Sequence, residues 1–109
     1  MTDIIIRKNS DGDICGFEMN GHAGFADYGK DIVCAALSML SINTINAIAE
    51  LTDSALSVNS DENKGYMSLM IDGPVSHDAE LLLKSYKLGI DAIYRQYGKK
   101  YLKTTIKEV

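Results

Sequence analysis

The sequence predicts one α+β domain over residues 1–109, with elements in the order β-β-α-β-β-α-β and an antiparallel or mixed sheet packed with two helices. The chain has 109 residues, 46% of them hydrophobic, which suits one hydrophobic core and is short for two domains. Five short strand-like segments are bounded by turn residues, and two longer segments have helical character. Because strand hairpins outnumber crossovers in this order, we expect the helices to cover a sheet with mainly antiparallel neighbours.

The chain is predicted to begin with a β-hairpin. Residues 3–9 include three consecutive isoleucines, and residues 14–21 alternate so that Cys15, Phe17 and Met19 share one face. The Ser-Asp-Gly-Asp segment between them contains residue types that tolerate the backbone angles of a tight turn. Cys15 is therefore expected to be a core residue.

A buried helix is predicted over residues 32–51. Asp31 is a suitable N-cap, because its carboxylate can accept a hydrogen bond from a free backbone N–H of the first turn. The segment is apolar on nearly all sides and its polar residues are small, as is typical of a helix buried on most of its surface.

The second half of the chain is predicted to form two more strands, a second helix and a final strand, without any internal sequence repeat. Ser76 is expected to cap the second helix, and Gly89 within it indicates a close approach to the first helix. The predicted strands cover residues 54–60, 65–71 and 101–109, and the predicted helix covers residues 77–97.

Composition excludes several classes of protein. The 15 acidic and 11 basic residues give a net charge of −4, which argues against a nucleic-acid binder that relies on bulk charge. No uninterrupted apolar run approaches about 18 residues, so no membrane span is predicted. Two cysteines and the lack of a signal-peptide pattern predict a cytoplasmic protein without a disulfide framework. Neither the cysteines nor the histidines have metal-ligand spacing, so no metal or cofactor is predicted.

The charge is unevenly distributed. Residues 1–94 hold six basic and 14 acidic side chains, whereas residues 95–109 hold five basic and one acidic. Lysines on an edge strand discourage unwanted strand pairing. A basic end can also contact RNA or an acidic partner, and this alternative stays open.

Cys34 and His22 are the candidate catalytic pair. With Asp31 as N-cap, Cys34 lies in the first helical turn, where unpaired N–H groups and the helix dipole stabilise a thiolate. His22 ends the preceding strand, and the intervening loop is long enough to return its imidazole to the thiol. A thiolate beside a histidine is the minimal unit for covalent acyl transfer, with N–H groups of residues 33–35 as oxyanion donors.

A structural interpretation of the same residues stays open. A single cysteine in an apolar helix is more often a small core residue, and a histidine at a strand end is more often a surface group. The Asp31 carboxylate also opposes a neighbouring thiolate while it orients the helix.

The segment GHAGFADYGKDIVCAALS, residues 21–38, resembles the signature of the ribosomal-processing cysteine proteases of bacteria, the Prp family. His22, Gly29, Asp31, Cys34 and Ser38 all fall at the motif positions. Length and element order match as well, so the resemblance covers nearly the whole chain.

This resemblance implies a homodimeric cysteine endopeptidase without a cofactor. Its substrate would be the N-terminal extension of a large-subunit ribosomal protein, cut after paired aromatic residues and before a small residue. Cys34 would be the nucleophile and His22 the general base and acid, with Asp31 and Ser38 in supporting roles. The loop residues Gly24, Phe25, Tyr28 and Gly29 are expected to admit and contact the peptide. The alternative is a non-enzymatic ribosome-associated or RNA-binding module that uses the basic end.

Overall fold

The structure is a computed structural model that describes residues 1–24, 26–27 and 31–109. All the predicted helices and strands are present, and each begins and ends within one residue of its predicted bounds. The elements are β1 (Thr2–Lys8), β2 (Ile14–Asn20), α1 (Ile32–Leu51), β3 (Ala55–Asp61), the short 3-10 helix η1 (Glu62–Lys64), β4 (Tyr66–Asp72), α2 (His77–Tyr97) and β5 (Leu102–Glu108).

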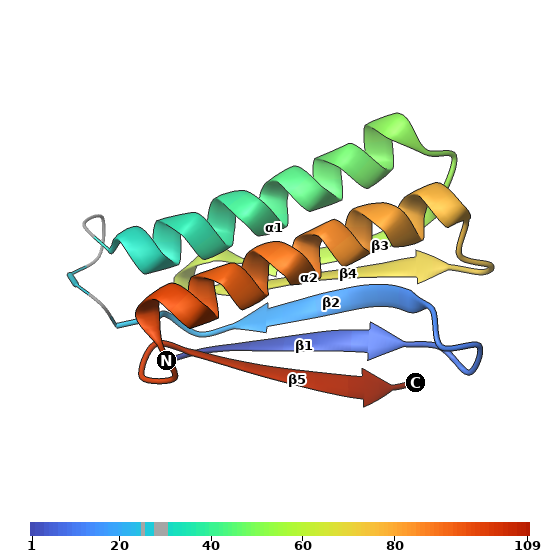
Figure 1. Ribbon diagram of the computed structural model, residues 1–109. Helices are drawn as coiled ribbons and strands as arrows, with labels where there is room; N and C mark the ends of the chain where they lie inside the picture. Colours follow the sequence, from blue (N-terminus) through green and yellow to red (C-terminus); the bar gives the residue numbers. More distant parts are fainter. Residues whose placement is uncertain (25, 28–30) are drawn as a thin grey trace.

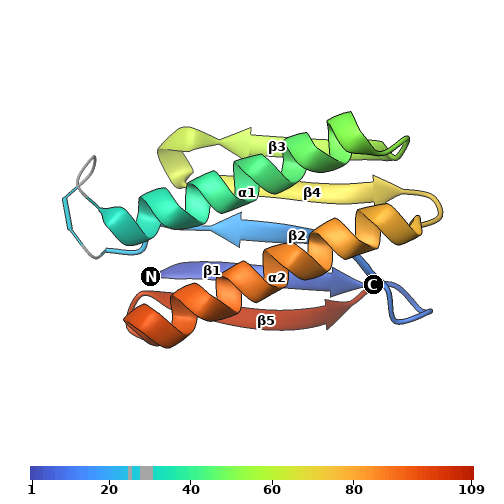
Figure 2. The ribbon, with the colours of Figure 1, turned by 45° about the horizontal axis from the view of Figure 1, so that its top comes forward.

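The strands form one mixed sheet in the order β3-β4-β2-β1-β5. The pairs β1–β2, β2–β4 and β3–β4 are antiparallel, whereas β1 and β5 are parallel. Both helices lie on the same face of the sheet and run beside each other, as Figures 1 and 2 show. The predicted fold class is confirmed, and of the two sheet types that the sequence allowed the structure has the mixed one.

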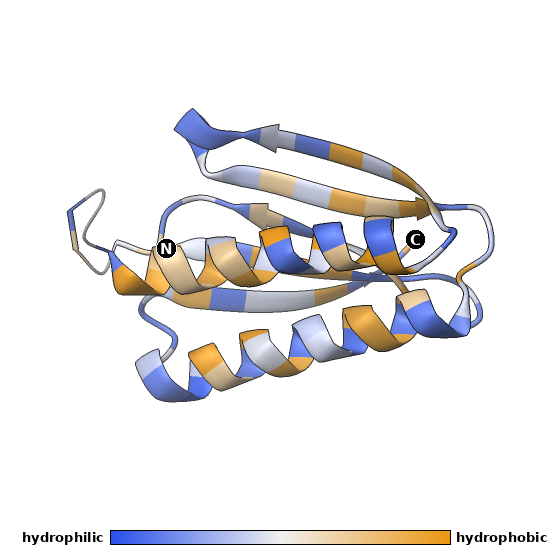
Figure 3. Ribbon diagram, turned by 90° about the horizontal axis from the view of Figure 1, so that it is seen from above, coloured by the Kyte–Doolittle hydropathy of each residue, from blue (hydrophilic) through white to orange (hydrophobic). Residues whose placement is uncertain are grey.

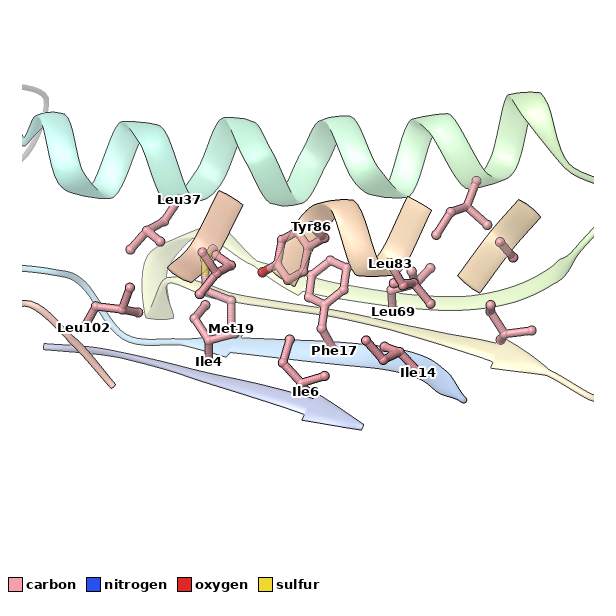
Figure 4. Packing of buried hydrophobic residues seen from close by; sticks show 14 of the residues in the cluster. Ile4, Ile6, Ile14, Phe17, Met19, Leu37, Leu69, Leu83, Tyr86 and Leu102 are labelled. Atoms are coloured by element: carbon pink, nitrogen blue, oxygen red, sulfur yellow. The ribbon is translucent and has the colours of Figure 1, made fainter. Parts of the chain in front are cut away.

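The core lies between the sheet and the two helices (Figure 4). The rings of Phe17 on β2 and Tyr86 on α2 are stacked with centroids 4.1 Å apart. The Tyr86 hydroxyl lies 2.9 Å from the Ser41 hydroxyl on α1, and Ser41 Oγ also donates to the Leu37 carbonyl. The two helices and the sheet are therefore joined by aromatic packing and by a buried polar contact that satisfies both hydroxyl groups.

Cys15 is buried but does not share the face predicted for it. The pairing of β1 with β2 shifts register between Arg7 and Lys8, so that Lys8 pairs with Ile14. Ile14 thereby joins Phe17 in the helix-facing cluster, and Cys15 lies in the bulge with its thiol 3.5 Å from the Arg7 carbonyl. An extra residue in a strand reverses the sheet faces to which the side chains beyond it point. A prediction based on strict alternation of faces therefore assigns these side chains to the wrong face.

Helix α1 is buried along one side only. By length and composition alone it is apolar enough to cross a membrane. It packs on the domain through a single stripe that includes Val33, Leu37 and Ile48, whereas Ile32, Met39 and Leu51 are more than half exposed. The prediction of a helix buried on most of its surface is therefore wrong, because an apolar composition on all sides does not show which sides find a packing partner. The first turn of α1 is strongly hydrophobic in Figure 3, beside the described part of the loop that follows β2. A Cβ on Gly89 would lie 2.6 Å from Leu40 Cδ2, which confirms the predicted close approach of the helices.

Candidate active site

Cys34 lies in the first turn of α1, as predicted. Asp31 is the N-cap residue, and its Oδ1 accepts a hydrogen bond of 2.9 Å from the Cys34 amide. The Asp31 residue is only 8% exposed, whereas Cys34 is partly exposed. The cap therefore fixes the backbone that carries the thiol and leaves the thiol within reach of a ligand.

His22 follows the end of β2 and faces Cys34. Its Nδ1 lies 3.7 Å from Cys34 Sγ, within hydrogen-bond range for sulfur. His22 is exposed, and its neighbour Ala23 is buried, so the backbone is anchored immediately after the imidazole. The structure thus brings the two predicted catalytic residues together, although they come from a strand end and a helix start.

Two cavities meet at this pair. The first, of about 170 Å³, lies between the start of α1 and the segment 62–67, and the side chains of Met19, Leu37 and Met67 supply apolar lining. The second, of about 330 Å³, lies towards the described part of the loop and is lined by Gly24, Asp31 and Ala35 among others. His22, Cys34 and Ser38 line both cavities, so a peptide can approach the thiol from either side.

Backbone amides near Cys34 that the sequence offered as oxyanion donors already donate hydrogen bonds to Asp31. The Cys34 N–H donates to the Asp31 carboxylate, and the Ala35 N–H donates to the Asp31 carbonyl at 3.0 Å. Two of the three amides expected to hold an oxyanion therefore already have acceptors. This arrangement argues against an oxyanion hole made of the Cys34 and Ala35 amides, because the same carboxylate that caps the helix occupies the first of them.

The remaining predicted site residues are placed as follows. Ser38 lies one helical turn after Cys34 and lines both cavities. Gly24 is exposed, has a φ of +75°, and lines the second cavity. Phe25, Tyr28 and Gly29 lie outside the described residues, so their predicted contacts with a peptide stay predictions.

The second cysteine and the second histidine lie away from the pair. Burial raises the pKa of the Cys15 thiol, which suits an unreactive core cysteine. His77 begins α2, where its Nδ1 lies 3.1 Å from the Asp78 carboxylate on the exposed surface. Among the residues that the structure describes, no group of three or more His, Cys, Asp or Glu side chains is arranged to hold a metal ion.

Sequence reasoning missed the wall of the site that comes from η1 and β4. Glu62, Gly65, Tyr66 and Met67 all line the first cavity. Nothing in the local sequence links this turn to the histidine, because the contact depends on β4 pairing with β2. The one available signal was the glycine that follows a polar turn. A glycine there predicts a left-handed backbone conformation, but it does not predict which residue will lie next to the turn in the fold.

Comparisons with known proteins agree with this geometry. A family model described as cysteine protease Prp matches residues 1–103. The ribosomal processing cysteine protease Prp of Staphylococcus aureus (strain Mu50) is 31% identical over 98 residues, covering 90% of this chain and 92% of that protein. The protein of the same name from Bacillus subtilis (strain 168) is 31% identical over 101 residues, covering 89% and 90%.

A solved structure extends the likeness to the whole fold. The crystal structure of the S. aureus ribosomal processing protease Prp, in complex with a covalently linked product peptide, superposes with a TM-score of 0.91 at 29% sequence identity. The superposition covers 98% of this chain and 100% of that chain. With the whole-chain sequence match and a facing cysteine and histidine, these likenesses lead to one conclusion: this chain belongs to the Prp family of cysteine proteases and is a cysteine peptidase.

Proposed function

We propose that this protein removes the N-terminal extension of a bacterial large-subunit ribosomal protein, with Cys34 as nucleophile and His22 as general base and acid. The observation that carries the proposal is the distance of 3.7 Å between Cys34 Sγ and His22 Nδ1 at the junction of two cavities. The names of its relatives, ribosomal processing cysteine proteases, support the choice of substrate. The family assignment leaves no support for a non-enzymatic module.

The reaction begins with proton transfer from the Cys34 thiol to His22. The thiolate attacks the carbonyl carbon of the scissile peptide bond, so that an S–C bond forms and the carbonyl electrons move to the oxygen. When the tetrahedral intermediate collapses, the C–N bond breaks and His22 returns its proton to the leaving amine. Water then hydrolyses the thioester, with His22 taking a proton from water and returning it to Cys34.

The first cavity supports a preference for an aromatic residue beside the cleaved bond. Its volume of about 170 Å³ is close to that of apolar protein cavities of ~150 Å³ that hold one benzene ring. The methionine and leucine side chains in its lining provide apolar contacts for such a ring. We therefore assign one aromatic side chain of the paired-aromatic motif to this cavity. The second cavity, next to Gly24 and Ala26, would receive the small residue that follows the cut.

Asp31 and Ser38 have supporting roles in this proposal. Asp31 holds the first turn of α1 in the conformation that presents the thiol. Ser38 lines both cavities and would donate a hydrogen bond to the bound peptide. The protein would work in the cytoplasm as a homodimer, without a cofactor. The negative charge of residues 1–94 would favour encounter with a basic ribosomal protein.

The test uses a synthetic peptide with two phenylalanines followed by alanine, and mass spectrometry of its products. Cys34→Ser and His22→Ala should each lower kcat/KM by about a thousandfold or more, because each removes one member of a pair that acts as a unit. Both variants should keep the wild-type circular dichroism spectrum.

The chain offers a matched control for each variant. Cys15→Ala removes the buried thiol and His77→Ala the exposed imidazole of α2, and both should cleave at close to the wild-type rate. Cleavage by Cys34→Ser at the wild-type rate would contradict the proposed nucleophile. Equal cleavage of a peptide with two alanines in place of the phenylalanines would contradict the aromatic preference.

A further inference from the structure

A turn far along the chain holds the backbone that precedes the histidine. The Gly21 N–H donates a hydrogen bond of 3.1 Å to the Gly65 carbonyl. Gly65 is the residue that links η1 to β4, and it lines the first cavity beside His22. The support for His22 therefore includes a residue outside the segment 21–38 that carries the family signature.

The turn has a well-defined shape of its own. The Asp61 carboxylate accepts hydrogen bonds from the amides of Asn63 and Lys64, at 3.1 and 3.3 Å. Gly65 closes the turn with φ +62° and ψ +38°, the left-handed conformation, and its N–H donates to the Glu62 carbonyl. These contacts fix the turn without using His22, so the turn can serve as a support for the imidazole.

The surface of Gly65 that faces His22 has no room for a side chain. A Cβ built on Gly65 would lie 2.6 Å from the Gly21 carbonyl oxygen and 3.0 Å from Cε1 of His22. Both distances are shorter than ordinary van der Waals contact, and the closer one is to a backbone atom. Glycine is thus required here by close approach as well as by the left-handed backbone.

We propose that Gly65 is a positioning residue for His22. Its bare α-carbon lets the edge of the imidazole lie against the turn, and this contact sets the separation of Nδ1 from Cys34 Sγ. The inference rests on the proposed function in one respect, because it takes His22 to be the catalytic base. A shift of the imidazole of about 1 Å is enough to cost about a hundredfold in rate.

The test compares Gly65→Ala with Gly73→Ala. Gly73 has a φ of +84°, and a Cβ on it would meet nothing within 4 Å. Gly73→Ala therefore carries the energetic cost of a left-handed alanine without any steric clash. We expect a fall in melting temperature for both variants, and a larger one for Gly65→Ala, because it adds the clash with the Gly21 backbone to the cost of the left-handed conformation. Gly65→Ala should lower kcat by about 10- to 100-fold with a much smaller change in KM, whereas Gly73→Ala should keep the wild-type kcat.

Alkylation of Cys34 by iodoacetamide gives a readout that needs no peptide. If Gly65 positions His22, the pH dependence of the alkylation rate should differ from wild type in Gly65→Ala and match wild type in Gly73→Ala. If Gly65 only shapes the cavity, KM rises and the alkylation profile stays unchanged, and the proposal is then wrong. Should the wild-type enzyme cleave no test peptide, the alkylation profiles still decide the role of Gly65.

Two further measurements separate the proposal from backbone strain and from misfolding of the variant. The first uses a residue that suits the left-handed backbone, and the second uses the wild-type protein alone. Gly65→Asn introduces the same Cβ clash as Gly65→Ala, while asparagine tolerates the left-handed region better than alanine, so it should remain impaired in kcat. In the wild-type protein, an NMR cross-relaxation signal should join His22 Hε1 to a Gly65 α-proton, because the built Cβ lies 3.0 Å from Cε1. A wild-type kcat in Gly65→Asn, or absence of that signal, would overturn the proposal.

Discussion

The two helices begin with the same capping geometry, yet only one of them begins at a candidate active site. In α1 the Asp31 side chain accepts from the Cys34 amide, and in α2 the Ser76 side chain accepts from the Ala79 amide. The next amide in each helix donates to the carbonyl of its cap residue at 3.0 Å. The two caps lie at opposite ends of the helix layer, as Figure 1 shows.

The difference lies in what surrounds each cap. Ala79 is fully buried, and the Glu80 carboxylate beside it accepts from the Ile14 amide at the start of β2. At the other end of the domain, Cys34 is partly exposed and faces the His22 imidazole at the point where two cavities meet. A capped helix N-terminus is therefore a structural feature in both cases, and its chemistry depends on the third residue and on the strand end opposite it.

Replacing each cap residue by alanine gives the largest expected contrast. Asp31→Ala and Ser76→Ala should each lower the free energy of unfolding by about 1 kcal/mol, measured by urea denaturation. Only Asp31→Ala should also slow peptide cleavage, by about tenfold, because the first turn that carries the thiol loses its fixed position.

Asparagine at the first cap separates the hydrogen bond from the charge. Asp31→Asn keeps an acceptor for the Cys34 amide and removes the negative charge beside the thiol. It should therefore cleave faster than Asp31→Ala. If Ser76→Ala slows cleavage as much as Asp31→Ala does, the caps act only through overall stability and the contrast between the two helix starts is lost.

The buried contact between the Tyr86 and Ser41 hydroxyls should make a smaller contribution to the free energy of unfolding, and this contribution should depend on pH. Burial raises the pKa of Tyr86 above its ordinary value of 10.0, because the folded protein disfavours the charged phenolate. The unfolded chain ionises first as the pH rises, so this contribution to stability is present below about pH 10 and is lost above it. Tyr86→Phe should lower stability by about 1 kcal/mol at pH 7 and remove this part of the alkaline decline.

Urea denaturation of both proteins between pH 7 and 11 measures this difference. Ser41 keeps its bond to the Leu37 carbonyl in the variant, so kcat at pH 7 should change by less than about twofold. Identical curves of stability against pH for wild type and Tyr86→Phe would show that the buried hydroxyl does not titrate with unfolding.

The local features of the site could be predicted from the sequence, and the long-range ones could not. The Asp31 cap follows from residue type and position, and it places Cys34 in the first helical turn. The parallel pairing of β1 with β5 and the wall from η1 depend on which strands become neighbours, which single-sequence periodicity does not determine. The bulge at Cys15 was missed because one extra residue leaves the composition of the strand unchanged.

The smallest effect on cleavage is expected at the basic end that follows α2. Lys103 and Lys107 lie on β5, an edge strand, and Lys100 lies with its Nζ 5.7 Å from the centroid of the Tyr101 ring. Replacing Lys99, Lys100, Lys103 and Lys107 by glutamine should leave kcat/KM within about twofold of wild type. Light scattering should show more self-association, because lysines protect an edge strand from pairing with other chains. A large loss of peptide cleavage would instead place this end in the substrate site.

The parallel pairing of β1 with β5 joins the two ends of the chain next to the candidate active site. Thr2 on β1 donates its amide proton to the Tyr101 carbonyl, and its hydroxyl reaches the Gly21 carbonyl at 3.4 Å. Thr2, which together with Gly65 contacts the backbone before His22, is thus itself held by a segment almost a whole chain length away. Contacts this distant in sequence form slowly. We therefore expect peptidase activity to appear late in folding, after the helices and the hairpins have formed.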